Sequence, residues 1–233
     1  MKRRFAFLCD FDGTVSPEDI GAALVERYSR TGGAGKQVLL EGWRSGSLGT
    51  RELIEAECAS LDVSEAEALD FTRRFRLDPD FAPFARRVLE AGGAVMVLSE
   101  GYGLYIRDQL ARAGLAHVPW AANYLVFEGR RVTPEFPHAS PECPRCGNCK
   151  GAHVRRYRDL GFETVMVGDG LSDRCGAGAA DRVLARGELL GWCRAENVAA
   201  DPFESFADVL RWALGLGVAG AGVDPDPAGA RGN

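Results

Sequence analysis

Five short apolar runs recur along the chain, and each is bounded by residues typical of turns. A run of four or five residues has the length of a strand rather than of a helix. Because the runs show no polar alternation, they predict strands buried on both faces of a parallel sheet. The runs are Phe5–Cys9, Ala94–Leu98, Val118–Ala122, Thr164–Val167 and Arg182–Ala185.

Segments with helical periodicity lie between these runs and stop at glycines. Phe84 and Val88 precede the pair Gly92 and Gly93, and other segments stop near Gly114 and Gly161. A glycine just after the last periodic residue is a typical helix end. The alternation of strand and helix predicts an α/β fold with an open parallel sheet and helices on both faces.

The interval 15–82 interrupts this alternation and contains no convincing strand. Its pattern predicts three helices. In the first, Ser16 caps the helix and Pro17 occupies the first helical position. The second begins at Thr50, and the third begins at Ser64 with a capping box. We therefore expect a helical cap inserted after the first strand, between the first two strands of the sheet.

Two smaller features complete the expected organisation. Residues 123–136 alternate around Glu128 and Gly129, which indicates a hairpin. The last residues are rich in Gly, Pro and Asp, a composition typical of disorder. We expect a catalytic core of residues 1–14 and 83–215, a cap of residues 15–82 and a disordered tail of residues 216–233.

Charge and cysteine content limit the partners and the compartment. The formal net charge is −5 and the sequence pI is about 5.4, which gives no electrostatic reason to expect nucleic acid or an anionic membrane. Seven scattered cysteines favour reduced thiols and a cytoplasmic location. The apolar run after the basic start ends at Asp10, too early for a secretory leader, which needs about 7 to 15 apolar residues. No run reaches the roughly 18 apolar residues of a membrane span.

Four groups of polar residues each follow a predicted strand or open a predicted helix. The carboxyl ends of parallel strands form a common crevice, so these groups can meet although they are distant in sequence. Crowded carboxylates require a divalent cation, and oxygen ligands favour Mg²⁺ over Zn²⁺. The groups are Asp10–Thr14, Ser99, Lys150 and Gly168–Asp173.

These residues resemble the four motifs of the haloacid dehalogenase superfamily of aspartate-nucleophile phosphatases, in the same order and strand context. The resemblance implies a flavodoxin-like (Rossmannoid) sheet and phosphate-ester hydrolysis. It implies that Asp10 is the nucleophile and becomes phosphorylated, and that Asp12 acts first as general acid and then as base. It also implies that Mg²⁺ is bound by Asp10, Asp169 and the backbone carbonyl of Asp12.

The same resemblance assigns the phosphate site. Ser99 and Lys150 would hold the phosphoryl oxygens, with Glu100 beside the phosphate. Asp173 would orient Lys150 or a metal-bound water, and Thr14 would support the metal ligands. A lysine in a chain with 25 Arg and three Lys indicates a site that needs a compact point charge.

Asp12 also bears on the choice of reaction within this superfamily. A halide leaves without being protonated, so dehalogenases have no carboxylate at this position, whereas an alcohol leaving group needs an acid. The presence of Asp12 therefore favours a phosphatase or a phosphotransferase.

The closer resemblance is to the group of phosphoserine phosphatase and 2-hydroxy-3-keto-5-methylthiopentenyl-1-phosphate phosphatase. It covers the chain to about residue 214. One departure is Glu100, where both enzymes usually have glycine. The helix that begins near Arg51 lacks the arginine that binds the carboxylate of phosphoserine, which argues against that substrate. Enol-phosphate, phosphoserine-like and sugar-phosphate substrates stay open, as does the role of Asp19, which either faces the substrate or only starts a helix.

The segment before Lys150 has two interpretations. Cys143, Cys146 and Cys149 have a CxxCxxC spacing that is typical of metal ligands, with His138 or His153 as a possible fourth ligand. Alternatively, this segment is a thiol-rich loop that positions Lys150. Cys58, Cys175 and Cys193 have the spacing of helix-core residues.

We therefore expect a Mg²⁺-dependent phosphatase acting on a small phosphorylated metabolite. The alternatives are a phosphotransferase and a non-catalytic zinc- or thiol-binding module on the same fold. The sequence does not determine the oligomeric state.

Overall fold

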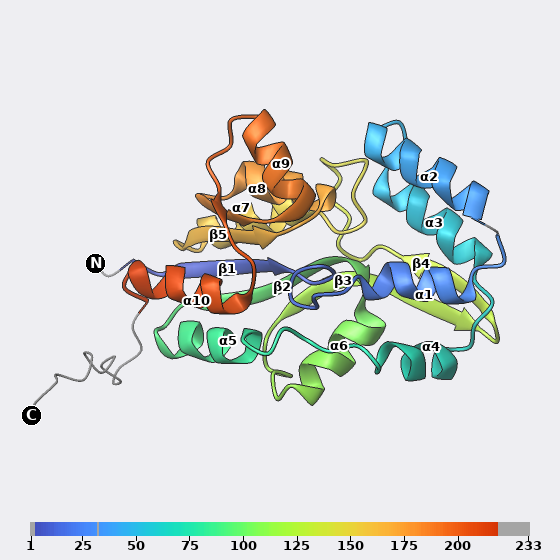
Figure 1. Ribbon diagram of the computed structural model, residues 1–233, viewed down its shortest axis with the longest axis horizontal. Coiled ribbons are helices and arrows are strands. Elements are labelled where there is room, and N and C mark those ends of the chain that lie inside the picture. The colour runs from blue at the N-terminus through green and yellow to red at the C-terminus, as the bar shows by residue number, and fades with distance from the viewer. Residues whose placement is uncertain (1–2, 32, 219–233) are drawn as a thin grey trace, which may run out of the picture.

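The computed structural model describes residues 3–31 and 33–218, which form a seven-stranded sheet flanked by helices (Figure 1). The strand order is β4-β3-β2-β1-β5-β6-β7. All neighbouring strands are parallel except β3 and β4. The strands are β1 (Phe5–Asp10), β2 (Ala94–Tyr102), β3 (Trp120–Glu128), β4 (Arg131–Glu135), β5 (Glu163–Gly168), β6 (Arg182–Ala185) and β7 (Asp201–Pro202).

Strand β1 lies in the middle of the sheet, where its apolar residues Phe5–Cys9 suit burial on both faces. All six residues are buried. Ala6 pairs with Ala94 of β2 on one side and with Thr164 of β5 on the other. The carboxyl ends of β1, β2 and β5 therefore meet at one edge of the sheet, as predicted.

Helices cover both faces, so the expected α/β fold class is confirmed (Figure 1). Alternate residues of β1 point to opposite faces: Phe7 belongs to one hydrophobic cluster with Phe84 and Phe206, whereas Leu8 packs in another with Val154. One face carries α5 (Phe81–Glu90), α6 (Gly103–Arg112) and α10 (Phe206–Gly215), and the other carries α7 (Lys150–Asp159), α8 (Arg174–Ala179) and α9 (Gly187–Ala195).

The interval 15–82 is helical, but its details differ from the prediction. Its described residues contain four complete helices rather than three: α1 (Ile20–Tyr28), α2 (Gly33–Ser45), α3 (Thr50–Ser60) and α4 (Glu65–Thr72). The prediction missed α2 because its sequence is interrupted by glycines. The predicted cap at Ser16 is wrong: α1 begins at Ile20, and Asp19 is its N-cap. The capping box of Ser64 is confirmed.

The two ends of this insert lie close together at the sheet. The backbone N–H of Asp78 donates to the carbonyl of Val15 at 2.8 Å. The Asp78 carboxylate in turn accepts the N–H of Phe206 at the start of α10. Between these ends, helices α2 and α3 project beyond the carboxyl ends of the strands, on the same side of the sheet as α9 (Figure 1).

The remaining expectations concern smaller elements. The hairpin is confirmed, since β3 and β4 are antiparallel and Glu128 pairs with Arg131. Val218 is buried, so packing continues past the expected start of the tail at residue 216. The rest of that tail lies outside the described residues. Within the described ranges, no helix is both long and apolar enough to cross a membrane.

Candidate active site

Asp10, Lys150 and Asp173 form a buried charged cluster at the carboxyl ends of the central strands. Lys150, the first residue of α7, donates from Nζ to Oδ1 of Asp10 and to Oδ1 of Asp173, the latter at 2.5 Å. Burial opposes the charge on Lys150, but the two carboxylates raise its pKa above the ordinary lysine value. The cluster therefore holds a permanent cation directly beside Asp10.

The charge on Asp10 depends on its neighbours. Burial and the negative charge of Asp173 raise the pKa of Asp10, whereas Lys150 lowers it, and the pKa lies well above that of an ordinary aspartate. A further cation at this position would favour the ionised form.

Asp12 is the most extensively hydrogen-bonded of the carboxylates. Its Oδ2 accepts from Tyr105 Oη at 2.6 Å and from Ser99 Oγ at 3.2 Å. Its Oδ1 accepts from the N–H of Ile20 at 2.9 Å, in the first turn of α1. Burial, together with the charge of Asp19, raises the pKa of Asp12 to about 7 despite these hydrogen bonds. A carboxyl group with this pKa can release or accept a proton near neutral pH.

The end of β2 places Ser99 beside Asp12 and depends on a glycine. The N–H of Gly101 donates to Ser99 Oγ at 2.8 Å. A Cβ at position 101 would lie 2.0 Å from the hydroxyl of Tyr105 and 2.4 Å from Asp12 Oδ2, so any side chain there would displace both groups.

The carboxylate of Glu100 is directed to the loop before α7. Its Oε2 accepts from the N–H groups of Gly147 and Asn148, each at 3.0 Å. Asn148 also donates to the backbone carbonyl of Ser99 at 3.0 Å. Burial raises the pKa of Glu100 to about 7. Glu100 and Asn148 therefore join the end of β2 to the loop that carries Lys150.

Three carboxylates form a group that could hold a metal ion. Asp10, Asp169 and Asp173 each offer an oxygen, and these atoms lie within 4.8 Å of one another. Thr14 Oγ1 donates to Asp169 Oδ1 at 2.8 Å. Gly13 has a φ of 78°, and a Cβ there would lie 2.4 Å from Asp169 Oδ2, so only glycine allows this close approach.

The all-oxygen donor set fits a hard divalent cation such as Mg²⁺. Asp173 is engaged elsewhere, because its Oδ2 accepts the N–H groups of Asp169 and Gly170, each at 3.0 Å. Asp10 and Asp169 are therefore the carboxylates best placed to bind the ion.

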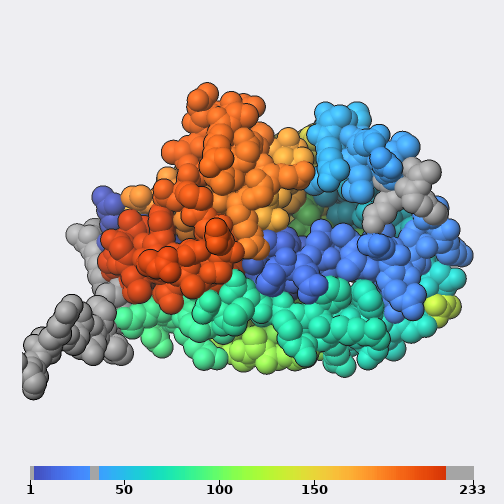
Figure 2. Space-filling model, viewed as in Figure 1, coloured from blue at the N-terminus to red at the C-terminus, as the bar shows by residue number. Residues whose placement is uncertain are grey.

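A cavity of about 370 Å³ opens over these residues, between the insert and α9. In Figure 2 it corresponds to the hollow between the light-blue α2 region and the orange α9 region. Asp10, Asp12 and Asp169 line its base, and Leu40, Trp43 and Ile54 from the insert line its wall. Asp19 also lines the cavity, while its side chain caps α1 by accepting from Ala22 N at 2.7 Å.

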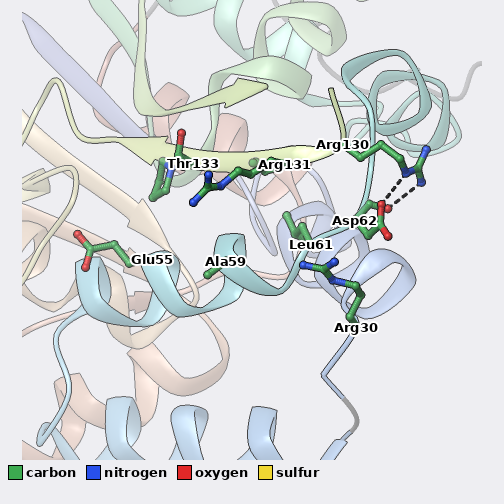
Figure 3. A pocket seen from close by; sticks show the side chains of 10 residues that line it. Arg30, Glu55, Ala59, Leu61, Asp62, Arg130, Arg131 and Thr133 are labelled. Atoms are coloured by element: carbon green, nitrogen blue, oxygen red, sulfur yellow. Dashed lines mark hydrogen bonds and ion pairs between the residues drawn. The ribbon is translucent and has the colours of Figure 1, made fainter. Parts of the chain in front are cut away.

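A second hollow, of about 610 Å³, lies between α3 and β4, and Asp10, Asp12 and Asp169 are not among its lining residues (Figure 3). Arg130 at its rim forms ion pairs with Asp62 and Glu67, each at 2.5 Å. The residues that line this hollow include none of the predicted site residues, so we do not associate it with catalysis.

Sequence reasoning missed two residues that support the site. Tyr105 lies on α6 and reaches Asp12 across the sheet end, with no motif around it. Arg186 precedes α9 and donates from Nε to the carbonyl of Gly13 at 3.0 Å. The excess of Arg over Lys gave no means of distinguishing this arginine from the others.

Comparison with protein families identifies the family of this chain. The family model of haloacid dehalogenase-like hydrolase matches residues 7–177, which contain every predicted site residue. The chain belongs to the haloacid dehalogenase-like hydrolase family. The match extends from β1 to α8 and includes the insert.

Curated relatives of this hydrolase are named as phosphatases. A 2-hydroxy-3-keto-5-methylthiopentenyl-1-phosphate phosphatase of Brevibacillus brevis is 30% identical over 215 residues, covering 91% of this chain and 96% of the relative. A protein of the same name from Exiguobacterium sp. is 28% identical, covering 91% and 98%. These relatives support a phosphoric monoester hydrolase and not the non-catalytic alternative.

Solved structures share the fold of this haloacid dehalogenase-like hydrolase. A phosphoserine phosphatase, described as a phospho-aspartyl intermediate analogue, superposes with a TM-score of 0.70 at 18% identity, covering 91% of this chain and 99% of the other. A substrate-bound phosphoserine phosphatase gives a TM-score of 0.68 at 16% identity, with the same coverage. The Rossmannoid fold expected from the motifs is therefore confirmed.

Proposed function

We propose that this enzyme is a Mg²⁺-dependent phosphatase that hydrolyses a small phosphorylated metabolite through a phosphorylated Asp10. The observation that carries the proposal is the position of Lys150, which bridges Asp10 and Asp173. A carboxylate and a phosphate dianion repel each other, and a buried cation in contact with the carboxylate reduces that repulsion.

In the first half-reaction, an oxygen of Asp10 forms a bond to phosphorus while the bond from phosphorus to the ester oxygen breaks. Asp12 gives its proton to the departing alcohol, and its pKa of about 7 suits this role. Ser99 lies beside Asp12 and, with Lys150, would bind the phosphoryl oxygens. The products are the alcohol and an aspartyl-phosphate.

In the second half-reaction, Asp12 takes a proton from water. The water oxygen forms a bond to phosphorus as the bond to Asp10 breaks, which releases orthophosphate and restores both carboxyl groups. Asp173 keeps Lys150 in place through both steps. Glu100 acts as a positioning residue for the loop before Lys150, since its carboxylate is bound to that loop.

Mg²⁺ would be held by Asp10 and Asp169, with the backbone carbonyl of Asp12 as a further ligand, and Thr14 would steady Asp169. When bound, the ion neutralises charge on the phosphoryl group and on the carboxylates. The close approach of Gly13 to Asp169 supports this assignment.

The cavity wall favours a substrate with an apolar end, such as the methylthio enol phosphate named for the curated relatives. Leu40, Trp43 and Ile54 provide an apolar surface opposite the carboxylates. Within the described ranges, Arg44 is the only cation in the wall, and its Nε lies 3.8 Å from Oε1 of Glu188. This pairing argues against phosphoserine, which presents a carboxylate.

We assign residues 15–82 to a cap that closes over this substrate and excludes water until the alcohol has left. We assign the reaction to the cytoplasm, where the seven free cysteines would stay reduced.

The proposal is tested by measuring the release of phosphate from a panel of enol, sugar and amino-acid phosphates in a buffer that contains Mg²⁺. Asp10→Asn should reduce turnover by roughly 10³-fold or more. In wild-type enzyme quenched during turnover, mass spectrometry should find phosphate on the peptide that contains Asp10. Substantial activity in Asp10→Asn, or no labelled peptide, would exclude the covalent mechanism. An added acceptor alcohol that becomes phosphorylated would instead indicate a phosphotransferase.

A further inference from the structure

Four cysteines meet beside the active site, and three of them belong to the CxxCxxC segment. The fourth is Cys175, on α8, whose Sγ lies 3.6 Å from Sγ of Cys146. Cys143 lies close enough to Cys146 and to Cys149 to interact with both thiols. The sulfur atoms thus lie in a series in the order Cys175, Cys146, Cys143 and Cys149.

This arrangement corrects one expectation from the sequence and bears on another. Cys175 was expected in a helix core, but the residue is exposed and its thiol faces the loop. Neither histidine is required as the fourth ligand. Nε2 of His153 lies 2.8 Å from Oδ1 of Asn148, and the ring of His138 packs against that of His153 at 5.6 Å.

Backbone donors point at the sulfur atoms. The N–H groups of Arg145 and Cys146 donate to the sulfur of Cys143. The N–H of Gly151 is directed toward the sulfur of Cys175, whereas the N–H of Ala152 donates to the backbone carbonyl of Cys149 at 3.0 Å. Hydrogen bonds from backbone N–H groups stabilise thiolates and fix their direction, as the groups around metal ligands do.

We propose that Cys143, Cys146, Cys149 and Cys175 bind one zinc ion. Four thiolates select zinc over Mg²⁺, and a site closed by four protein ligands has no position for substrate, so the ion would be structural. The 3.6 Å separation of Cys146 and Cys175 is close to the distance between two ligands of a tetrahedral Zn–S site with bonds of about 2.3 Å. Among the described residues, no three of these four sulfur atoms all lie within 4.8 Å of one another, so zinc binding would draw the outer sulfurs inward.

The position of the site gives it a function. Cys149 precedes Lys150, and Cys175 lies just after Asp173 on the neighbouring helix (Figure 1). An ion bound to both segments would hold α7 and α8 together where the Lys150–Asp173 ion pair joins them. Zinc would thus fix the catalytic lysine without contacting the substrate.

The test is metal analysis of full-length protein purified with Zn²⁺ and then passed through a Mg²⁺ buffer. Wild type and Cys193→Ala, which changes a buried thiol of α9, should each retain one zinc per chain. Cys175→Ser should lose most of that zinc. Asp169→Asn should retain it, which separates this site from the carboxylate group and from the proposed phosphatase mechanism.

Cobalt provides a second measurement that does not depend on a variant's folding. Wild-type protein reconstituted with Co²⁺ should show an intense sulfur-to-cobalt charge-transfer band and the visible absorption of a tetrahedral site. No retained zinc together with no such band would overturn the proposal. A Cys146–Cys175 disulfide as the stable form in protein purified under reducing conditions would also overturn it.

Discussion

Tyr105 donates a hydrogen bond of 2.6 Å to Oδ2 of Asp12, from a helix that carries no recognisable motif. The hydroxyl stabilises the ionised carboxylate and so lowers the pKa of Asp12, against burial, which raises it to about 7. Tyr105 therefore adjusts the strength of the proposed acid although it does not line the cavity.

We expect Tyr105→Phe to extend activity to higher pH. Alcohol release in the wild type should decline above about pH 7, because Asp12 loses the proton that the alcohol needs. Without the hydroxyl the pKa of Asp12 rises, by about one unit if the hydrogen bond contributes ~1 kcal/mol. The measurement is the pH dependence of single-turnover alcohol release. Tyr102→Phe is the control, since that hydroxyl contacts Cys58; equal displacement of both profiles would contradict the assignment.

Asp12→Asn should discriminate between leaving groups. An alkyl alcohol needs a proton to leave, whereas p-nitrophenolate does not, so the loss should be roughly 10²-fold or more for an alkyl phosphate and much smaller for p-nitrophenyl phosphate. The quantity to compare is the pre-steady-state burst of each alcohol, because the later hydrolysis also uses Asp12. Equal losses for both substrates would show that Asp12 does not act as the acid.

Lys150→Arg should lower kcat by roughly 10²-fold although the charge is retained. Lys150 is completely enclosed between Asp10 and Asp173, and a planar guanidinium does not fit where a compact ammonium is bound. Steady-state kinetics and a thermal unfolding curve would separate lost catalysis from lost folding. A folded variant with near wild-type kcat would refute the need for a point charge at this position.

Asp169→Asn should weaken metal activation. Removal of divalent ions by a chelator should abolish turnover in the wild type, and added Mg²⁺ should restore it. The variant should need a Mg²⁺ concentration at least roughly ten times higher for half-maximal activity, because it loses a carboxylate of the ligand group. Asp70→Asn is a suitable control, since that side chain is 78% exposed. Identical Mg²⁺ titrations for the two variants would exclude Asp169 as a ligand.

Glu100→Gln should change how stability depends on pH. Burial raises the folded-state pKa of Glu100 from 4.5 to about 7. The protonated side chain therefore contributes to the free energy of unfolding fully below pH 4.5, and this contribution is lost as the pH rises through 7. From pH 4.5 to 8, the free energy of unfolding of the wild type should fall by up to roughly 3 kcal/mol relative to that of the variant. Urea unfolding at both pH values measures this difference; parallel pH dependence in the two proteins would contradict the shifted pKa.

Much of the site was predictable because its residues follow strands. Asp10 ends β1 and Ser99 belongs to β2, and parallel strands present their carboxyl ends together. Lys150 stood out by its residue type. These relationships are local in sequence or follow from sheet geometry.

The other contributions depend on packing between distant elements. Tyr105 reaches Asp12 only because α6 packs against β3 and Gly101 leaves room for the hydroxyl. Cys175 reaches Cys146 only because α8 packs beside α7. Nothing near either residue in the sequence records its partner.

The hydrogen bonds from Ile20 and Gly21 to Asp12 link the proton donor to the insert, because α1 is the first helix of that insert. The insert acts on the pKa of Asp12 in two opposing ways, because burial and the charge of Asp19 raise it, whereas the N–H groups of Ile20 and Gly21 lower it. Closure of the insert would thus set the acidity of Asp12 before the alcohol leaves, and the proton that Asp12 gives away would return from water in the hydrolysis step.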